Sequence, residues 1–329
     1  MGRTVITAFN DFQKNIVNLD SGKTKTARLS RDWLLGQISQ FPSRDHNFPK
    51  LYEEKNVFFG SFSKRTKIRE LDDIDLMVAL SAEEGYYADH GNYIAIHVKE
   101  EKLGLLCNND TDILNSKKVI NKIISQLNQV SQYDSADMKR NQEAATLKLK
   151  SYTWNFDIVP CFFTKKDAYD KDYYLIPDGN GNWKKTDPRI DSKRTSEVNQ
   201  YHDGNVLNVI RIIKYWNKRP VMPSMSSYLL ENMILNYYIQ NQYNKASQYV
   251  DLEIIKIFQY LSSQMFNSVS DPKGIQGELN NLSFDDKIKI STRAKLDYQK
   301  AVEARDYEEK GDHVNSIKKW KEVLGQSFY

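Results

Sequence analysis

The sequence predicts an α+β protein, in which a lobe built on a mixed sheet is followed by a helical lobe. Two observations predict this fold. Apolar residues recur at three-to-four spacing at both ends of the 329-residue chain, which is the spacing of amphipathic helices. Short runs rich in β-branched and aromatic residues fill the stretch between residues 57 and 163, and such runs are typical of strands.

The chain opens with two predicted helices and continues into strands. The first helix is predicted from apolar residues at helical spacing, namely Val5, Ala8, Phe9, Phe12, Ile16 and Val17. The second contains Ala27, Trp33, Leu34, Leu35 and Ile38 and ends near Phe41-Pro42. Strands are predicted at 57–59, 74–80, 93–98, 144–150 and 156–163. Between the third and fourth strands, apolar residues from Ile113 to Leu127 predict a helix of about four turns on one face of the sheet.

Turn signals and then helices make up the second half of the chain. Residues 170–195 hold Asp178-Gly179, Asn180-Gly181 and Asp187-Pro188, and we expect the connection between two domains there. We place the boundary between a core domain, 1–185, and a helical domain, 186–329, on which the N-terminal helices can also pack. Helices are predicted at 206–216, 227–238, 250–265, 285–307 and 315–324. Trp216 and Trp320 lie among aliphatic neighbours at helical spacing, so we expect both to be packing residues.

Composition excludes several classes of protein. A mean hydropathy of −0.66, with no apolar run approaching about 18 residues, excludes a membrane span, and 12% aromatic residues exclude an unfolded chain. The formal charge of +4 is small, so we expect no stable binding to duplex DNA. Two cysteines, Cys107 and Cys161, are too few for a disulfide framework, and no export signal is visible. We therefore expect a cytoplasmic protein.

One short stretch has the pattern of an anion-binding loop. Gly60 and Ser61 follow a predicted strand and precede a short helix. Glycine lets the backbone approach a phosphate closely, and the amide and hydroxyl of Ser61 at a helix start are donors to an anion. The stretch is therefore a plausible cradle for a triphosphate.

Three aspartates carry the chemistry that the sequence predicts. Asp73 and Asp75 stand two residues apart in a strand, so their carboxylates point to the same face, while Ile74 faces the core. Asp157 lies in a second apolar strand, where a buried charge needs a metal ion or a cationic partner such as arginine. Because neighbouring carboxylates repel each other unless a cation lies between them, and Mg²⁺ prefers oxygen ligands, we expect a magnesium site.

These residues carry a resemblance to a known family. The motif G-S-x-x-(K/R)-x-T at 60–66, then D-I-D-L-M at 73–77 and F-D-I-V-P at 156–160, resembles the polymerase-β-like nucleotidyltransferases. Within them the chain is most similar to the bacterial second-messenger oligonucleotide synthetases, the CD-NTases. The resemblance extends to residues 210–216, to S-Y-x-L-E at 227–231 and to the terminal helix, and so covers nearly the whole chain.

The resemblance implies a fold, a reaction and a set of site residues. It implies two lobes with a central cleft, in which Asp73, Asp75 and Asp157 bind two Mg²⁺ ions, with Mn²⁺ as a possible replacement. Asp157 would also orient the attacking ribose hydroxyl or take its proton. The nucleotide-binding residues that it implies are Gly60, Ser61, Lys64, Lys214, Ser227 and Tyr228; of these, Lys214 and Ser227 would meet phosphate and Tyr228 would stack on a base.

The resemblance also implies the product and its use. ATP and a second nucleoside triphosphate would be joined into a cyclic di- or trinucleotide, which a separate effector protein would read, commonly in anti-phage defence. We expect a monomer that does not bind membranes. Two alternatives remain open on the residues: a template-independent nucleotidyltransferase acting on RNA 3′ ends or a small alcohol, and a catalytically silent nucleotide sensor.

Overall fold

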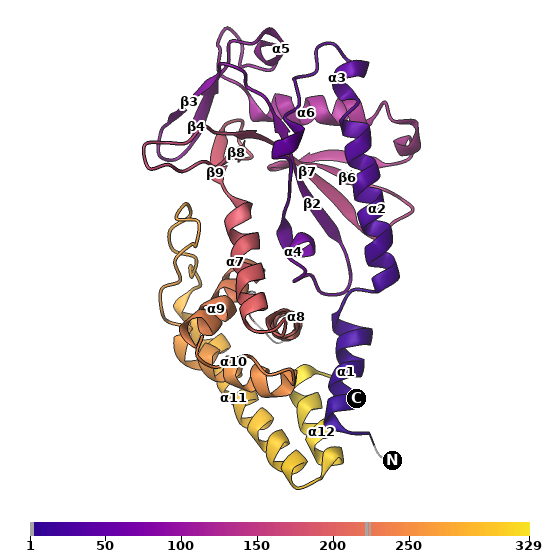
Figure 1. Cartoon of the computed structure of the whole chain (residues 1–329), viewed down its shortest axis with the longest axis vertical. Helices are drawn as coiled ribbons and strands as arrows, with labels where there is room; N and C mark the ends of the chain where they lie inside the picture. Colours follow the sequence, from indigo (N-terminus) through magenta and orange to yellow (C-terminus); the bar gives the residue numbers. More distant parts are fainter. Residues whose placement is uncertain (1–2, 221–222, 224) are drawn as a thin grey trace. The chain divides into compact units, whose positions relative to one another are not determined.

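In the computed structural model, which describes residues 3–220, 223 and 225–329, helices lie before, among and after the strands (Figure 1). The chain forms two units. The sheet unit comprises Gly22–Lys64 and Leu71–Ser192. The helical unit comprises Met1–Ser21, Arg65–Glu70 and Lys193–Tyr329. The boundary expected between residues 185 and 186 stays a prediction.

The sheet has nine strands in the part of the chain that the structure describes, in the order β1-β2-β7-β8-β9-β4-β3, with β6 also beside β7 and β5 beside β6. The strands are β1 Val57–Phe58, β2 Asp73–Leu80, β3 Tyr86–Asp89, β4 Ile94–His97, β5 Asp137–Asn141, β6 Ala144–Lys148, β7 Asn155–Phe163, β8 Tyr174–Pro177 and β9 Trp183–Thr186. Most neighbours are antiparallel, but β2 and β7 run parallel. This central pair carries the three aspartates singled out above.

The turn-rich segment 170–195, where we expect the connection between two domains, also holds two strands that extend the sheet. β8 and β9 pair as an antiparallel hairpin. The Asp178 carboxylate closes the turn between them, since its Oδ1 accepts hydrogen bonds from the N–H groups of Asn180, Gly181 and Asn182. The Asp-Gly and Asn-Gly dipeptides lie in the turn of this hairpin. Such dipeptides favour a turn, but they do not distinguish a hairpin turn from a connection between domains.

Helices cover the sheet unit where the apolar pattern predicted them. The unit's helices are α2 Ser21–Ile38, α3 Phe41–Arg44, α4 Gly60–Ser63, α5 Glu101–Gly104 and α6 Ser116–Leu127, with 3₁₀ turns at Glu53–Lys55 and Ser131–Tyr133. The side chain of Asn115 caps α6 by accepting from the N–H groups of Lys117 and Lys118. Val119, Ile120 and Ile123 are buried, and α6 packs against β5 to β8 as expected.

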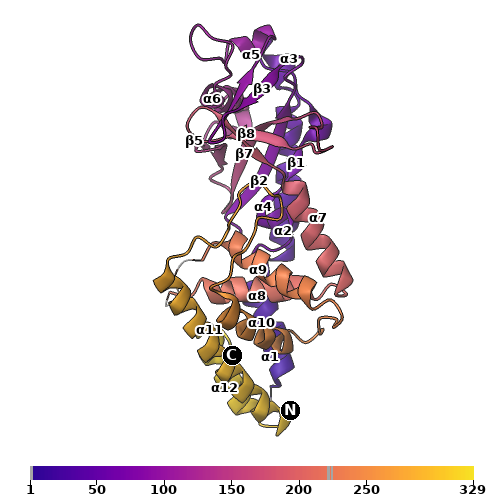
Figure 2. The ribbon, with the colours of Figure 1, turned by 90° about the vertical axis from the view of Figure 1, so that its left-hand side faces the viewer.

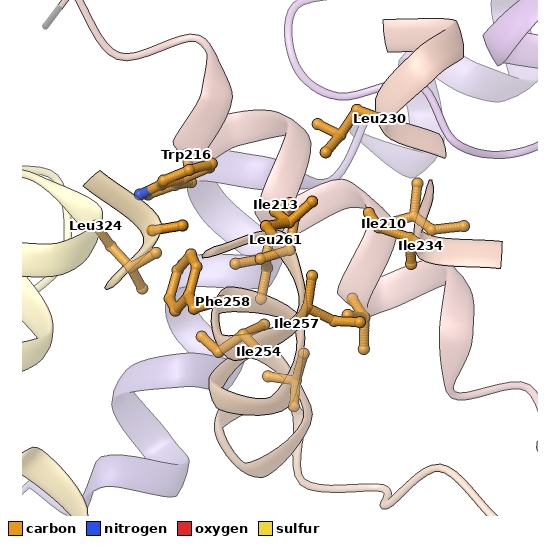
Figure 3. Packing of buried hydrophobic residues seen from close by; sticks show 14 of the residues in the cluster. Ile210, Ile213, Trp216, Leu230, Ile234, Ile254, Ile257, Phe258, Leu261 and Leu324 are labelled. Carbon is orange, nitrogen blue, oxygen red and sulfur yellow. The ribbon is translucent and has the colours of Figure 1, made fainter. Parts of the chain in front are cut away.

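The helical unit is held together by one large apolar core. Its helices are α1 Val5–Phe12, a π-helical turn Gln13–Val17, α8 Val206–Asn217, α9 Ser227–Gln240, α10 Val250–Gln264, α11 Phe284–Glu309 and α12 His313–Leu324, while α7 Pro188–Tyr201 begins in the sheet unit. α11 and α12 run side by side (Figure 2). Figure 3 shows Trp216 beside Phe258 and Leu324 in the core. Trp216 and Trp320 are fully buried, which confirms that both are packing residues.

Candidate active site

The register of β2 and β7 brings the three predicted acids to one face of the sheet. Asp75 lies directly opposite Asp157, and Asp73 lies opposite Asn155. Because side chains alternate between faces along a strand, Asp73 shares the face of this pair. The intervening residues Ile74 and Phe156 are buried on the other face, while the three acids are partly exposed. Two strands far apart in sequence thus present three carboxylates together.

Asp157 has a hydroxyl partner. The Oγ1 of Thr146, its cross-strand neighbour on β6, donates to Asp157 Oδ1 at 2.6 Å. Thr146 is itself buried. This contact holds one carboxylate oxygen in place without neutralising the charge. The Asp–Arg pair that we considered for this position is therefore not what the described residues form.

The predicted Gly60-Ser61 loop lies against Asp75. The φ of Gly60 is +72°, and a Cβ added there would lie 1.8 Å from Asp75 Oδ2. Only glycine fits this position, because any side chain would collide with the carboxylate. Ser61 and Lys64 follow in the short helix α4 and at its C-terminal cap, where the Lys64 N–H donates to the carbonyl of Gly60. The loop and the acids thus form one cluster within the sheet unit.

The acids fit a hard cation in chemistry and in backbone register. Carboxylate oxygens are the ligands that Mg²⁺ and Mn²⁺ prefer, and strands that pair in a sheet lie about 4.8 Å apart. In the described residues, however, no three acidic, histidine or cysteine side chains converge closely enough to hold an ion as they stand.

In the helical unit, Lys214 is held by a carboxylate that the sequence argument missed. Lys214 Nζ lies 2.6 Å from Glu231 Oε1, and both side chains are nearly inaccessible, at 4% and 3%. The same oxygen accepts a hydrogen bond of 2.9 Å from Thr66 Oγ1. Glu231 thus joins three stretches of chain: the segment Arg65–Glu70, α8 and α9. The lysine expected to meet phosphate is therefore also part of a buried ion pair.

Ser227 and Tyr228 open helix α9. Ser226 rather than Ser227 is the cap, since its Oγ accepts from the N–H of Leu229 at 3.1 Å, and Ser227 is exposed. The hydroxyl of Tyr228 donates to Asp271 Oδ1 at 2.9 Å. Lys273, from the same loop as Asp271, also donates to this hydroxyl. Neither loop residue was predicted, and only the Asp-Pro and Lys-Gly turn signals around them were visible in the sequence.

The residues that the prediction missed have weak signals in the sequence. Thr66 and Glu231 are the last letters of the two motifs quoted above, so a partnership between them could have been suspected. Thr146 has none, because a threonine in a strand is ordinary.

A large cavity in the sheet unit lies away from these residues. It has a volume of about 1090 Å³ and is lined by Leu80 and Phe163, at the far ends of β2 and β7 from the acids, and by Tyr52 and Lys55. None of the predicted site residues lines it. We therefore build the candidate site on the acids and their loop.

Comparisons with known proteins show what the sequence and the fold are similar to. No protein-family model matches the sequence. The fold is similar to that of Escherichia coli MS115-1 CdnC, solved with ATP, with a TM-score of 0.71 and 16% identity over 98% of each chain. The same CdnC, solved as a complex with HORMA-deltaN, gives the same TM-score and identity over 98% of this chain and 97% of that one. Escherichia coli DncV, in a 3′-deoxy GTP bound form, has a TM-score of 0.66 and 13% sequence identity over 97% of each chain.

These likenesses define the fold, which is that of CdnC and DncV. A protein of Bacillus cereus (strain VD146) named "Probable cyclic nucleotide synthase" is 48% identical over 100% of this chain and 98% of its own length. The chain belongs to this family, the bacterial CD-NTases, and is a nucleotidyltransferase that makes cyclic nucleotides. None of the helices in the described part of the chain is long and apolar enough to cross a membrane.

Proposed function

We propose that the chain joins nucleoside triphosphates, ATP among them, into a cyclic di- or trinucleotide in a Mg²⁺-dependent reaction. The observation that carries this proposal is the register of β2 and β7, which sets Asp75 opposite Asp157 with Gly60 packed against Asp75. Nucleotidyl transfer needs positioned phosphates and neutralised charge rather than a nucleophilic side chain. The glycine-serine loop would position the phosphates, and the acidic face would hold the Mg²⁺ ions whose charge neutralises them.

Each residue of the acidic cluster has a role in the proposed reaction. Asp73 and Asp75 hold Mg²⁺, with Asp157 completing the set; when bound, the metal supplies charge neutralisation at the triphosphate and at the attacking hydroxyl. The Gly60-Ser61 turn binds the donor phosphates. Asp157 orients the attacking ribose hydroxyl through its second oxygen, Oδ2, because Thr146 already holds Oδ1.

The chemical step is an in-line displacement. The ribose oxygen of one nucleotide forms a bond to the α-phosphorus of another, the bond from that phosphorus to the β-phosphate oxygen breaks, and pyrophosphate leaves. The proton of the hydroxyl passes to Asp157 or to solvent. A second transfer within the linear product closes a dinucleotide ring, and a third is needed for a trinucleotide.

Labelled nucleotides test this proposal directly. The chain is incubated with labelled ATP, GTP, CTP and UTP and Mg²⁺, then with phosphatase, and the products are separated. A small phosphatase-resistant product supports cyclisation. A ladder, or labelling that depends on added RNA, contradicts cyclisation and favours terminal transfer, and an absence of any product favours a nucleotide sensor. Replacing Mg²⁺ by EDTA should abolish the product, and Mn²⁺ should restore it.

The family resemblance supports a proposal about use. We infer that the product is a second messenger in anti-phage defence, read by a separate effector protein. Cells that carry the chain with its neighbouring genes should plate phage less efficiently than cells carrying the Asp75→Asn variant. Equal plating efficiencies would contradict this role.

A further inference from the structure

The ring of Tyr228 is fixed by an ordered loop that no motif of the sequence marks. Tyr228 is the second residue of α9, so the capped first turn of that helix sets its backbone. Its hydroxyl donates to Asp271 Oδ1 at 2.9 Å. Because both the Cα and the hydroxyl end are held, the ring has little freedom to rotate.

That loop is Ser270–Glu278, and an antiparallel bridge between Ser270 and Glu278 closes it. Asp271 holds the loop together. Its carboxylate is fully buried and accepts hydrogen bonds from the backbone N–H groups of Lys273, Ile275 and Gln276. Burial by itself would raise the pKa of Asp271, but these bonds, the Tyr228 hydroxyl and the charge of Lys273 together lower it. The carboxylate is thus charged at neutral pH and anchors both the loop and the tyrosine.

Lys273 reaches the hydroxyl end of the ring. Its Nζ lies 4.2 Å from the centre of the Tyr228 ring and 3.2 Å from Asp271 Oδ1, and it also donates to the Tyr228 hydroxyl. Only 4% of the lysine side chain is exposed. Asp271 and Lys273 therefore both hold the hydroxyl end of the tyrosine.

We propose that Asp271 and Lys273 are positioning residues that hold the Tyr228 ring in place for stacking on a nucleobase. This inference rests on the proposed function, in which Tyr228 stacks on a base. Asp271 and Lys273 both hold the hydroxyl end of the ring, so a bound nucleotide meets a single ring orientation. Neither residue touches the reacting phosphate in this proposal.

The same helix offers a matched control. The hydroxyl of Tyr238, ten residues after Tyr228, donates to Glu253 Oε2 at 2.9 Å, and Lys256 Nζ lies 2.7 Å from the other oxygen of that carboxylate. This is again a tyrosine, a carboxylate and a lysine, but in a position with no proposed role. Tyr238→Phe therefore removes the same kind of hydrogen bond from the same unit.

The experiment compares steady-state kinetics of product formation in Tyr228→Phe, Lys273→Met, Lys273→Arg and Tyr238→Phe. Stacking on an aromatic side chain is worth roughly 5- to 150-fold in binding, and a misoriented ring loses part of it. Tyr228→Phe and Lys273→Met should raise KM for at least one triphosphate about tenfold and change kcat less than about threefold, because uniform binding is lost. Lys273→Arg, which keeps the charge, should recover most of the loss.

The outcomes separate this inference from the proposed function. Tyr238→Phe should lower the melting temperature about as much as Tyr228→Phe and leave every KM unchanged. If Tyr228→Phe and Lys273→Met leave every KM within twofold of the wild type, or if Tyr238→Phe raises KM equally, the positioning role is wrong although the enzyme is active. A wild-type chain that makes no product overturns the proposed function and this inference together.

Discussion

The buried pair of Lys214 and Glu231 gives a prediction whose size follows from its geometry. Glu231→Ala leaves the Lys214 ammonium, only 4% exposed, without the carboxylate that lies 2.6 Å away. Removing one partner of a buried ion pair costs about 3–5 kcal/mol, because the other charge stays desolvated. The Thr66 hydroxyl loses its acceptor as well. Since the free energy of unfolding of a domain is about 5–15 kcal/mol, the loss should be conspicuous.

A double-mutant cycle measures the effect. Free energies of unfolding are obtained from urea titrations of the wild type, Glu231→Ala, and the cycle formed by Glu231→Leu, Lys214→Met and the double variant Lys214→Met/Glu231→Leu. Each single variant should lose about 3 kcal/mol or more. The double variant should lose much less than the two together, because an apolar pair of similar volume often replaces a buried ion pair at little cost.

An exposed ion pair supplies the control. Lys193 and Glu197 lie one helical turn apart in the same unit. Lys193 Nζ is 3.8 Å from Glu197 Oε1, and more than half of each side chain is exposed. Glu197→Ala should therefore change the free energy of unfolding by at most about 0.5 kcal/mol. A Glu231→Ala variant that loses less than about 1 kcal/mol, or a double variant that loses the sum of the two single losses, would refute the reasoning.

Three further predictions concern the acids, the loop and pH. Asp75→Asn should lower product formation more than about 100-fold with an unchanged melting temperature, since it removes charge at constant volume; a variant that unfolds would count against the metal site. Gly60→Ala should abolish most activity, because its Cβ would lie 1.8 Å from Asp75 Oδ2, whereas Gly91→Ala, also at positive φ but with no atom within 4 Å, should stay active; equal activities would contradict the close approach. Burial lowers the pKa of His202, so below roughly pH 6.5 the unfolded chain binds more protons than the folded chain, and the free energy of unfolding falls as pH falls. His202→Gln should reduce this dependence of the free energy of unfolding on pH. The matching variant of the exposed His90 should not. The free energies of unfolding are measured by urea titration at pH 5 and at pH 8. If they differ between the two pH values by the same amount in His202→Gln as in the wild type, His202 does not contribute.

Much of the fold was predictable from local patterns. The strands β2 and β7, the helix α6 and the helices of the second half follow from the period of the apolar residues, because burial of one face imposes that period on the sequence. The hairpin β8–β9 was missed, since Asp-Gly and Asn-Gly mark a turn without saying whether strands on either side pair. The short edge strands β3 and β5 lack an apolar run, and their sequences resemble loops.

The sequence by itself determined that Asp73 and Asp75 share a face, because a strand has a period of two, and that a glycine precedes Ser61. Only the tertiary structure decided which side chains from distant segments touch these residues. Asp157 meets Asp75 through strand register, Thr146 meets Asp157 across a third strand, and Glu231 meets Lys214 and Thr66. Contacts between residues far apart in the chain depend on how whole elements pack, and a single sequence carries no local signal for that packing.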